Sequence, residues 1–146
     1  MGDFANDIQS TFKNEWIKAA LNIKYTANYL ANLSEKFFEP YGISSQQYNV
    51  LRILRGAKKP ITVSDIKSRM VEKTPNTTRL MDKLCAKELI KRSRSEADRR
   101  TVYSEITKSG LDLLAEIDKT NHTIATNLIT EEEAKELNRL LDKIRQ

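Results

Sequence analysis

A chain of 146 residues, 39% hydrophobic and 31% charged, is long enough for one domain with a packed core and too apolar to be disordered. No apolar run approaches the roughly 20 residues that a membrane-spanning helix needs, and the first ten residues lack the basic and apolar segments of a signal peptide. The single cysteine excludes an internal disulfide and fits a reducing compartment, so a cytoplasmic location without a membrane partner is expected.

The formal net charge of +5 lies in one part of the chain. Residues 67–100 contain eleven Lys and Arg against five Asp and Glu, whereas the remaining residues contain fourteen against fifteen. A cationic region on a near-neutral body is typical of a protein that binds a polyanion such as nucleic acid. A run of charges can also be an ordinary solvated surface, so the pattern within the segment decides between the two.

The first two elements predicted along the chain are helices. Residues 8–38 have apolar side chains three or four positions apart and no Gly or Pro, which predicts one long helix. Pro40 and Gly42 end that pattern. Ser44 or Ser45 is then expected to cap a second helix that has an apolar stripe of its own.

A short third helix is predicted to begin at Thr62, with Asp65 three residues later in the arrangement of a capping box. A fourth helix should follow, with Thr74 as its N-cap and Pro75 at its first position, where the missing N–H costs nothing. Its apolar side chains should face inward and its polar side chains outward. The residues expected on or beside the outer face are Thr74, Pro75, Asn76, Thr77, Thr78, Arg79 and Lys83.

Residues 89–94 and 101–106 alternate in polarity and contain Val, Ile and Tyr, which predicts two strands joined by the polar turn SEADRR. Thr107 is expected to cap a fifth helix and Thr130 to cap the last one. The fifth helix should extend through an apolar stripe made of Leu111, Leu114, Ile117, Ile124 and Leu128.

Four helices, a hairpin and two further helices predict a mainly α-helical fold with a small β-hairpin wing, a winged helix-turn-helix. In such a fold the third helix braces the fourth, whose outer face lies in the DNA major groove. Asn, Thr, Arg and Lys are side chains that read base edges and hold phosphates, so the pattern favours a DNA-binding protein. The alternative is a winged-helix adaptor that mainly binds protein or RNA, and its outer face should be acidic or apolar.

The segment DRRTVYSEITKSG resembles the motif Asp-x-Arg-x5-Leu-Thr-x-x-Gly of the MarR family of bacterial transcription regulators. The matching positions are Asp98, Arg100, Thr107 and Gly110, with Ile106 in place of the leucine. The segment NTTRLMDKLCAKELIKR is similar to the recognition helix of that family, although Glu88 stands where a glycine is usual.

The resemblance implies a homodimer that binds palindromic double-stranded DNA, usually as a repressor and often released by a small ligand or by oxidation. Within one domain, residues 1–42 would form an N-terminal dimerisation helix and residues 43–107 the winged helix-turn-helix. Residues 108–146 would form C-terminal dimerisation helices.

In proteins of this family the wing tip places an arginine in the minor groove, where negative potential is concentrated. The family pattern favours Arg100 for this role, with Arg99 at a phosphate, and Asp98 is expected to hold a neighbouring guanidinium in a bidentate pair. Without the resemblance, the same residues would form an ordinary polar turn. The wing residues expected at DNA are Arg94, Ser95, Asp98, Arg99 and Arg100.

Family members often hold aromatic effectors between the first, second and fifth helices. Packing and dimer contacts are the alternative role for aromatic side chains in that region. The candidate effector residues are Tyr25, Tyr29, Phe38, Tyr41 and Tyr48.

Other chemistry has little support in the sequence. Cys85 is more typical of a small core residue than of a redox sensor, and His122 as the single histidine excludes a histidine-rich metal site. The acids at 131–133 suit a helix N-terminus better than a metal. No nucleophile–base pair, Gly-rich phosphate loop or metal-binding motif occurs, so no enzyme activity, cofactor or metal is expected.

Overall fold

The computed structural model describes residues 2–120 and 128–146. Its strands form one antiparallel sheet in the order β1–β3–β2, and the expected fold class, a mainly α-helical winged helix-turn-helix, is confirmed. The elements in chain order are α1 (Phe4–Asp7), α2 (Glu15–Phe38), the 3-10 helix η1 (Glu39–Tyr41), α3 (Ser45–Ala57), β1 (Ile61–Thr62), α4 (Val63–Arg69), α5 (Thr77–Ala86), β2 (Ile90–Arg94), β3 (Val102–Ile106), α6 (Lys108–Asp118) and α7 (Glu131–Ile144).

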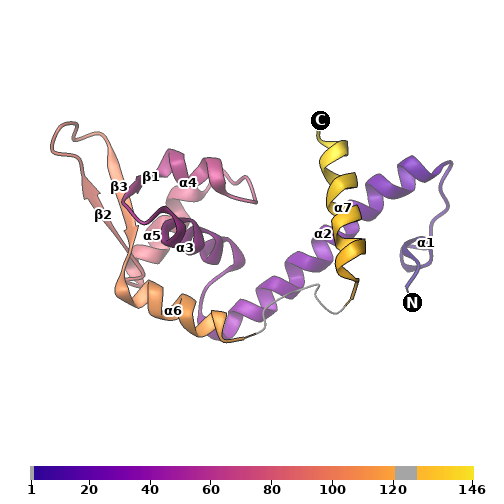
Figure 1. Cartoon of the computed structure of the whole chain (residues 1–146), viewed down its shortest axis with the longest axis horizontal. Coiled ribbons are helices and arrows are strands. Elements are labelled where there is room, and N and C mark those ends of the chain that lie inside the picture. Colours follow the sequence, from indigo (N-terminus) through magenta and orange to yellow (C-terminus); the bar gives the residue numbers. More distant parts are fainter. Residues whose placement is uncertain (1, 121–127) are drawn as a thin grey trace.

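The helix-turn-helix and the wing form one end of the molecule, and α2 leads from them to the other end (Figure 1). The β2–β3 hairpin projects beyond the helices, and α6 starts at its base (Figure 1). Both α1 and α7 lie at the end away from the wing (Figure 1). The parts expected to bind DNA are therefore separated in space from the N- and C-terminal helices.

The hydrophobic core forms around α3, which packs against the other helices of the winged region and against the sheet. Full burial of a Leu, Ile or Met side chain stabilises a fold by about 1.5–3 kcal/mol, so this core fixes how α5 and the wing are presented. Its most deeply buried apolar members are Phe38, Val50, Leu51, Leu54, Ile66, Met81, Leu84, Leu114 and Ile117.

The helix caps follow the local sequence. Ser44 caps α3, with a capping box completed by Gln47, and Thr62 caps α4 with Asp65, as predicted. The Thr62 hydroxyl donates to Asp65 Oδ2 at 2.8 Å and the Thr62 N–H donates at 3.1 Å. These two hydrogen bonds, the hydroxyl first, lower the pKa of Asp65 below its ordinary value.

The long N-terminal helix begins seven residues later than predicted. Asn14 caps α2, and its side chain accepts a hydrogen bond from the N–H of Ile17 at 2.9 Å. Gln9 has a left-handed backbone with φ of 50°, which ends α1 and separates it from α2. Phe12, expected on the helical stripe, stacks on Phe4 instead, with ring centroids 5.4 Å apart.

The fifth predicted helix is shorter than expected, because α6 ends at Asp118 and the hydroxyl of Thr120 donates to the carbonyl of Ile117 at 2.6 Å. Ile124, also assigned to that helix, lies outside the described residues. Leu128 lies in the turn before α7. Thr130 caps α7 as predicted, in a capping box with Glu133.

Apolar side chains of α2 and α7 are left uncovered in the single chain. Trp16 is 84% exposed, and no residue of α7 is buried. Leu137 is 48% exposed and Ile144 is 65% exposed. In the part of the chain that the structure describes, none of the helices is both long and apolar enough to cross a membrane.

Candidate nucleic-acid interface

Helix α5, the predicted recognition helix, begins two residues later than expected, because Asn76, not Thr74, is its N-cap. A residue before proline favours extended backbone, so Thr74 stays outside the helix and its hydroxyl accepts from the N–H of Asn76 at 3.2 Å. Pro75 lies in the turn between them. Thr77, expected on the outer face, is fully buried and donates to the carbonyl of Thr74 at 3.3 Å. Thr77 therefore anchors the start of the helix and cannot reach DNA.

The core fixes which face of α5 points outward, since Met81 and Leu84 are fully buried on the other side. Positions 76, 79 and 83 are three and four apart, so they form one stripe along the helix. Of the ion pairs found among the described residues, none uses Arg79 or Lys83, so both cations can meet an anion. The exposed polar residues of this face are Asn76, Thr78, Arg79, Asp82 and Lys83.

The tip of the hairpin is organised by Asp98. Its Oδ1 accepts from the N–H of Arg100 at 3.0 Å, and its Oδ2 accepts from the hydroxyl of Thr101 at 3.2 Å. Its own N–H donates to the hydroxyl of Ser95 at 3.3 Å. The expected bidentate pair with a guanidinium is therefore wrong: the carboxylate is used by the turn itself, since Asp readily bonds the N–H two residues on.

Arg94 and Ser95 brace the tip of the hairpin through hydrogen bonds, whereas Arg99 and Arg100 lie at the tip itself. The guanidinium of Arg94 donates to the carbonyl of Arg99 at 3.3 Å, and the N–H of Ser95 donates to the carbonyl of Thr101 at 3.0 Å. The residues Arg99 and Arg100 are exposed at the tip. The hairpin thus presents two adjacent cations on a hydrogen-bonded turn.

The base of the wing is joined to α6 by Thr107. Its hydroxyl donates to the carbonyl of Glu88 at 2.7 Å and accepts from the N–H of Gly110 at 3.1 Å. Gly110 is buried, and a Cβ there would lie 2.4 Å from the carbonyl oxygen of Leu89. The threonine and glycine of the C-terminal motif therefore pack α6 closely against the wing.

The turn from α5 into β2 has the geometry that usually calls for glycine. Glu88 has a left-handed backbone with φ of 58°, which costs an L-residue about 1–2 kcal/mol. The N–H of Glu88 donates to the carbonyl of Cys85 at 2.9 Å, and that of Leu89 to the carbonyl of Leu84 at 3.1 Å. This is a Schellman C-cap, so the turn is kept although a glutamate occupies it.

An ion pair links α5 directly to the wing, because Asp82 Oδ1 lies 2.7 Å from Arg92 Nη2. A second pair, Lys91 with Glu105 at 2.9 Å, lies within the sheet. Neither Asp82 nor Arg92 was singled out from the sequence. The available signal was that Arg92 lies two residues after the apolar Ile90 in the predicted strand, which puts both side chains on the same face of the sheet.

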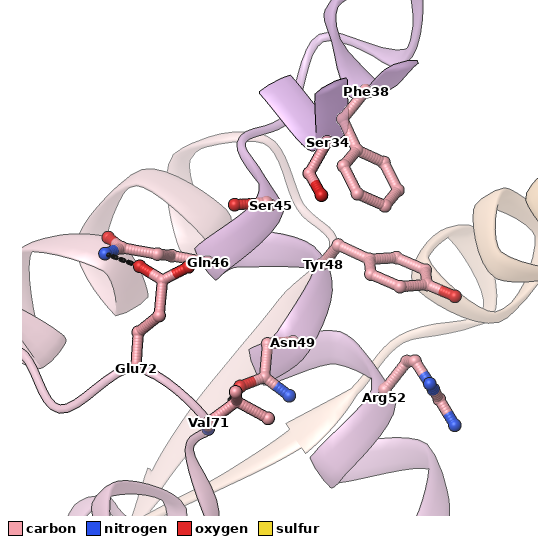
Figure 2. A pocket seen from close by; sticks show the side chains of 9 residues that line it. All are labelled: Ser34, Phe38, Ser45, Gln46, Tyr48, Asn49, Arg52, Val71 and Glu72. Atoms are coloured by element: carbon pink, nitrogen blue, oxygen red, sulfur yellow. Dashed lines mark hydrogen bonds between the residues drawn. The ribbon is translucent and has the colours of Figure 1, made fainter. Parts of the chain in front are cut away.

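An open cavity of about 210 Å³ lies between the end of α2, α3 and the loop after α4. Phe38 and Tyr48, two of the five candidate effector residues, line it with ring centroids 4.4 Å apart. The guanidinium of Arg52 lies 5.9 Å from the Tyr48 ring. Figure 2 shows Arg52 and Tyr48 on one side of the cavity and Glu72, hydrogen-bonded to Gln46 at 2.8 Å, on the other.

The other three aromatic candidates do not line this cavity. Tyr25 packs on Phe4 with ring centroids 5.3 Å apart, and Tyr41 packs beside Phe37 at 5.8 Å. Tyr29 is 54% exposed on α2. The structure therefore brings together only the aromatic pair at the junction of α2 and α3.

Cys85 is half-buried and packs against the core. Within residues 2–120 and 128–146, no group of three or more His, Cys, Asp or Glu side chains is arranged to hold a metal ion. Glu133 is used by the α7 capping box, and His122 lies outside the described residues.

Comparison with known proteins identifies the family. The model of the MarR family matches residues 43–102. The chain is 31% identical over 112 residues to the HTH-type transcriptional regulator MgrA of Staphylococcus aureus, which is 76% of each protein. The members of this family are transcription regulators and not enzymes.

Two solved structures are similar throughout. A MarR transcription factor from Planctomyces limnophilus matches with a TM-score of 0.69 and 28% identity, over 92% of this chain and 98% of that one. A mutant of MarR from E. coli complexed with operator DNA has a TM-score of 0.77 over 98% of this chain and 99% of that one. At 23% identity, the second likeness concerns the fold alone. The chain belongs to the MarR family and is a DNA-binding transcription regulator of the winged helix-turn-helix type.

Proposed function

We propose that this regulator is a homodimer that binds a palindromic operator and represses transcription there until a small aromatic ligand releases it. The observation that carries the proposal is that the exposed polar face of α5 and the arginine-bearing hairpin tip share one end of the molecule (Figure 1). A helix and a wing so placed fit a major groove and a neighbouring minor groove. The outer face of α5 is polar and basic, which favours DNA over an adaptor's protein or RNA partner.

In this proposal, α5 reads bases and holds the phosphates beside them. Arg79 and Lys83 carry the positive charge of the outer face, and Asn76 and Thr78 can hydrogen-bond base edges. Pro75, Thr74 and Thr77 build the turn that leads into the helix and are not assigned a contact with bases.

At the wing, Arg100 enters the minor groove and Arg99 meets phosphate. Asp98 acts as the organiser of the turn, because its carboxylate holds the N–H of Arg100. Asp98→Ala should therefore weaken operator binding although it removes a negative charge. Tighter operator binding by this variant at every salt concentration would show that Asp98 has no organising role.

The dimer is proposed to form through α2 and α7, with residues 1–42 and 108–146 as dimerisation regions around a DNA-binding region at 43–107. Exposed apolar surface beyond a few hundred Å² is unusual for a monomer, and a two-fold axis lets each helix cover its copy. Leu137→Lys should give a monomer by light scattering, as should deletion of residues 131–146. Glu132→Lys, which adds a lysine to the opposite side of α7, should leave a dimer. If Leu137→Lys and the truncated chain stay stable dimers, this interface is wrong.

The operator is tested by selecting fragments of the source genome that the purified protein retains. A dimer with two recognition helices should enrich inverted half-sites whose centres are about 10 base pairs, or one helical turn, apart. Enriched sites that overlap promoters support repression. Retention of random fragments without a shared sequence would overturn the proposal of a specific operator. Since DNA lies in the cytoplasm of a bacterium, the protein is proposed to act there.

The cavity beside Phe38 and Tyr48 is the proposed ligand site. An apolar cavity of about 150 Å³ can hold a benzene ring, so a single-ring aromatic acid fits here with its carboxylate toward Arg52. A ligand releases DNA only if it binds the DNA-free dimer geometry more tightly. Phenolic acids should raise the melting temperature of the protein and lower operator affinity, and Arg52→Ala should abolish both effects. If no phenolic acid in a broad panel shifts the melting temperature, Phe38 and Tyr48 have only a packing role.

A further inference from the structure

We infer that the Asp82–Arg92 ion pair sets the position of the wing relative to the recognition helix and thereby contributes to operator specificity, without either residue contacting DNA. This inference rests on the proposed use of α5 and the wing on DNA. Asp82 Oδ1 and Arg92 Nη2 are 2.7 Å apart, and the side chain of Arg92 is only 29% exposed. Among the residues that the structure describes, it is the one ion pair that joins α5 to a strand of the wing.

The strand register explains why Arg92 faces α5. Arg92 and Ile90 are two residues apart in β2, so their side chains lie on the same face of the sheet, and Ile90 is 3% exposed. Directly opposite Arg92 in β3 is Ser104, which is fully buried. The stem of Arg92 therefore leaves the buried side of the sheet and brings the guanidinium to α5.

The wing needs a connection such as the Asp82–Arg92 pair because a small change of angle at its base produces a large displacement at its tip. Five residues of strand span about 17 Å, so a change of about 10° at the base moves the tip by about 3 Å. The minor groove is only about 6 Å wide. The covalent connection at the base runs through Glu88, whose left-handed backbone is costly for a glutamate. A second connection part-way along β2 resists this change in angle.

The charge of Asp82 makes the inference testable. Asp82 is three residues from Arg79 and adjacent to Lys83, so it lies beside the cations of the outer face. If electrostatic attraction alone decided affinity, removing this acid would tighten binding to every DNA. If the pair positions the wing, removing the acid should weaken binding to the operator in particular.

The experiment measures affinity for the operator and for random DNA of equal length, over a range of salt, with the full-length protein. Asp82→Ala should lower the ratio of the two affinities about two- to fivefold, the effect of one partly exposed charge pair. Glu105→Ala is the matched control, since it removes the acid of the Lys91–Glu105 pair within the sheet, and its ratio should stay that of the wild type. Asp82→Glu can still reach Arg92 and should restore most of the ratio.

A double-mutant cycle separates positioning from contact. Arg92→Met keeps the stem, and the double variant Asp82→Ala/Arg92→Met should bind no worse than Arg92→Met alone. A further loss in the double variant, or a salt slope lowered by about one in Arg92→Met, would mean that Arg92 holds phosphate and would overturn the inference. An unchanged ratio in Asp82→Ala, even with a lower melting temperature, would also overturn it. A wild type without any preference for the selected operator would instead refute the proposed function, before any variant is compared.

Discussion

Replacing Gly110 with alanine puts a methyl group where the structure has no space for one. The added Cβ would lie 2.4 Å from the carbonyl oxygen of Leu89 and 2.6 Å from Cγ1 of Ile106. Non-bonded carbon atoms meet at about 3.5–4.0 Å, so α6 or the base of the wing must shift by about 1 Å. Because the nearest atom belongs to the backbone, no side-chain rotation relieves the contact.

The net effect follows from two opposing terms. Overpacking of a dense interior costs about 1–3 kcal/mol, and a backbone contact places this case toward the upper end. Alanine in a helix returns about 1 kcal/mol relative to glycine. The free energy of unfolding of Gly110→Ala should therefore fall by about 1–2 kcal/mol, which lowers the melting temperature by about 2–8 °C.

The assay is thermal unfolding at one fixed protein concentration, because association raises the melting temperature. Gly56→Ala is the control: this helical glycine of α3 has no described atom within 4 Å of an added Cβ. That variant should gain about 0.5–1 kcal/mol. Gly110→Ala should also bind operator less well, since the wing base moves. A Gly110→Ala protein as stable as the wild type would refute the close packing of α6 on the wing.

Three further changes test single features by unfolding measurements. Glu88→Gly should raise the free energy of unfolding by about 0.5–1 kcal/mol, since glycine adopts the left-handed backbone without strain, and no gain would contradict that geometry. Ser104→Ala should raise it by about 1 kcal/mol, because among the described residues the buried hydroxyl has no hydrogen-bond partner, and a loss would reveal a partner. In the folded protein the pKa of Asp65 is lower than its unfolded value of about 3.9, so the ionised carboxylate stabilises the fold. This stabilisation is fully present above the unfolded pKa and is lost as the pH falls through the folded pKa. Asp65→Asn should thus lower stability at neutral pH and flatten its decline below about pH 4, and an unchanged pH profile would contradict this.

Much of the fold was predictable from local signals. The capping residues Thr62 and Thr107 marked helix starts correctly, because their hydroxyls bond N–H groups three residues on. The prediction of Thr74 as a helix N-cap was wrong, since the proline after it favours extended backbone. The prediction of Thr77 on the outer face was wrong because its hydroxyl donates to a carbonyl inside the fold. The strand β1 has two residues, too few to show an alternation of polarity.

The parts of the candidate site that lie within one continuous motif could be predicted from the sequence. The contacts between residues far apart in the sequence could not. The hairpin followed from its alternation, but whether Asp98 bonds a guanidinium or the backbone depends on the turn that forms. The Asp82–Arg92 pair joins a helix to a strand, and composition gives no sign of such a contact. The predicted set of five effector residues was too large, since only Phe38 and Tyr48 among them line the cavity.

The wing contact is the central claim, and the salt dependence of DNA affinity tests it most directly. Operator and random-DNA affinities are measured for Arg100→Ala, with Arg139→Ala as the matched control, because Arg139 lies on α7 and is paired with Glu136 at 2.7 Å. Arg100→Ala should lose about 1–3 kcal/mol of operator binding and most of the preference for a narrow minor groove, and Arg99→Ala should weaken all DNA alike and lower the salt slope by about one. Arg139→Ala should bind as the wild type does. Operator affinity and salt slope unchanged in both Arg99→Ala and Arg100→Ala would contradict the account.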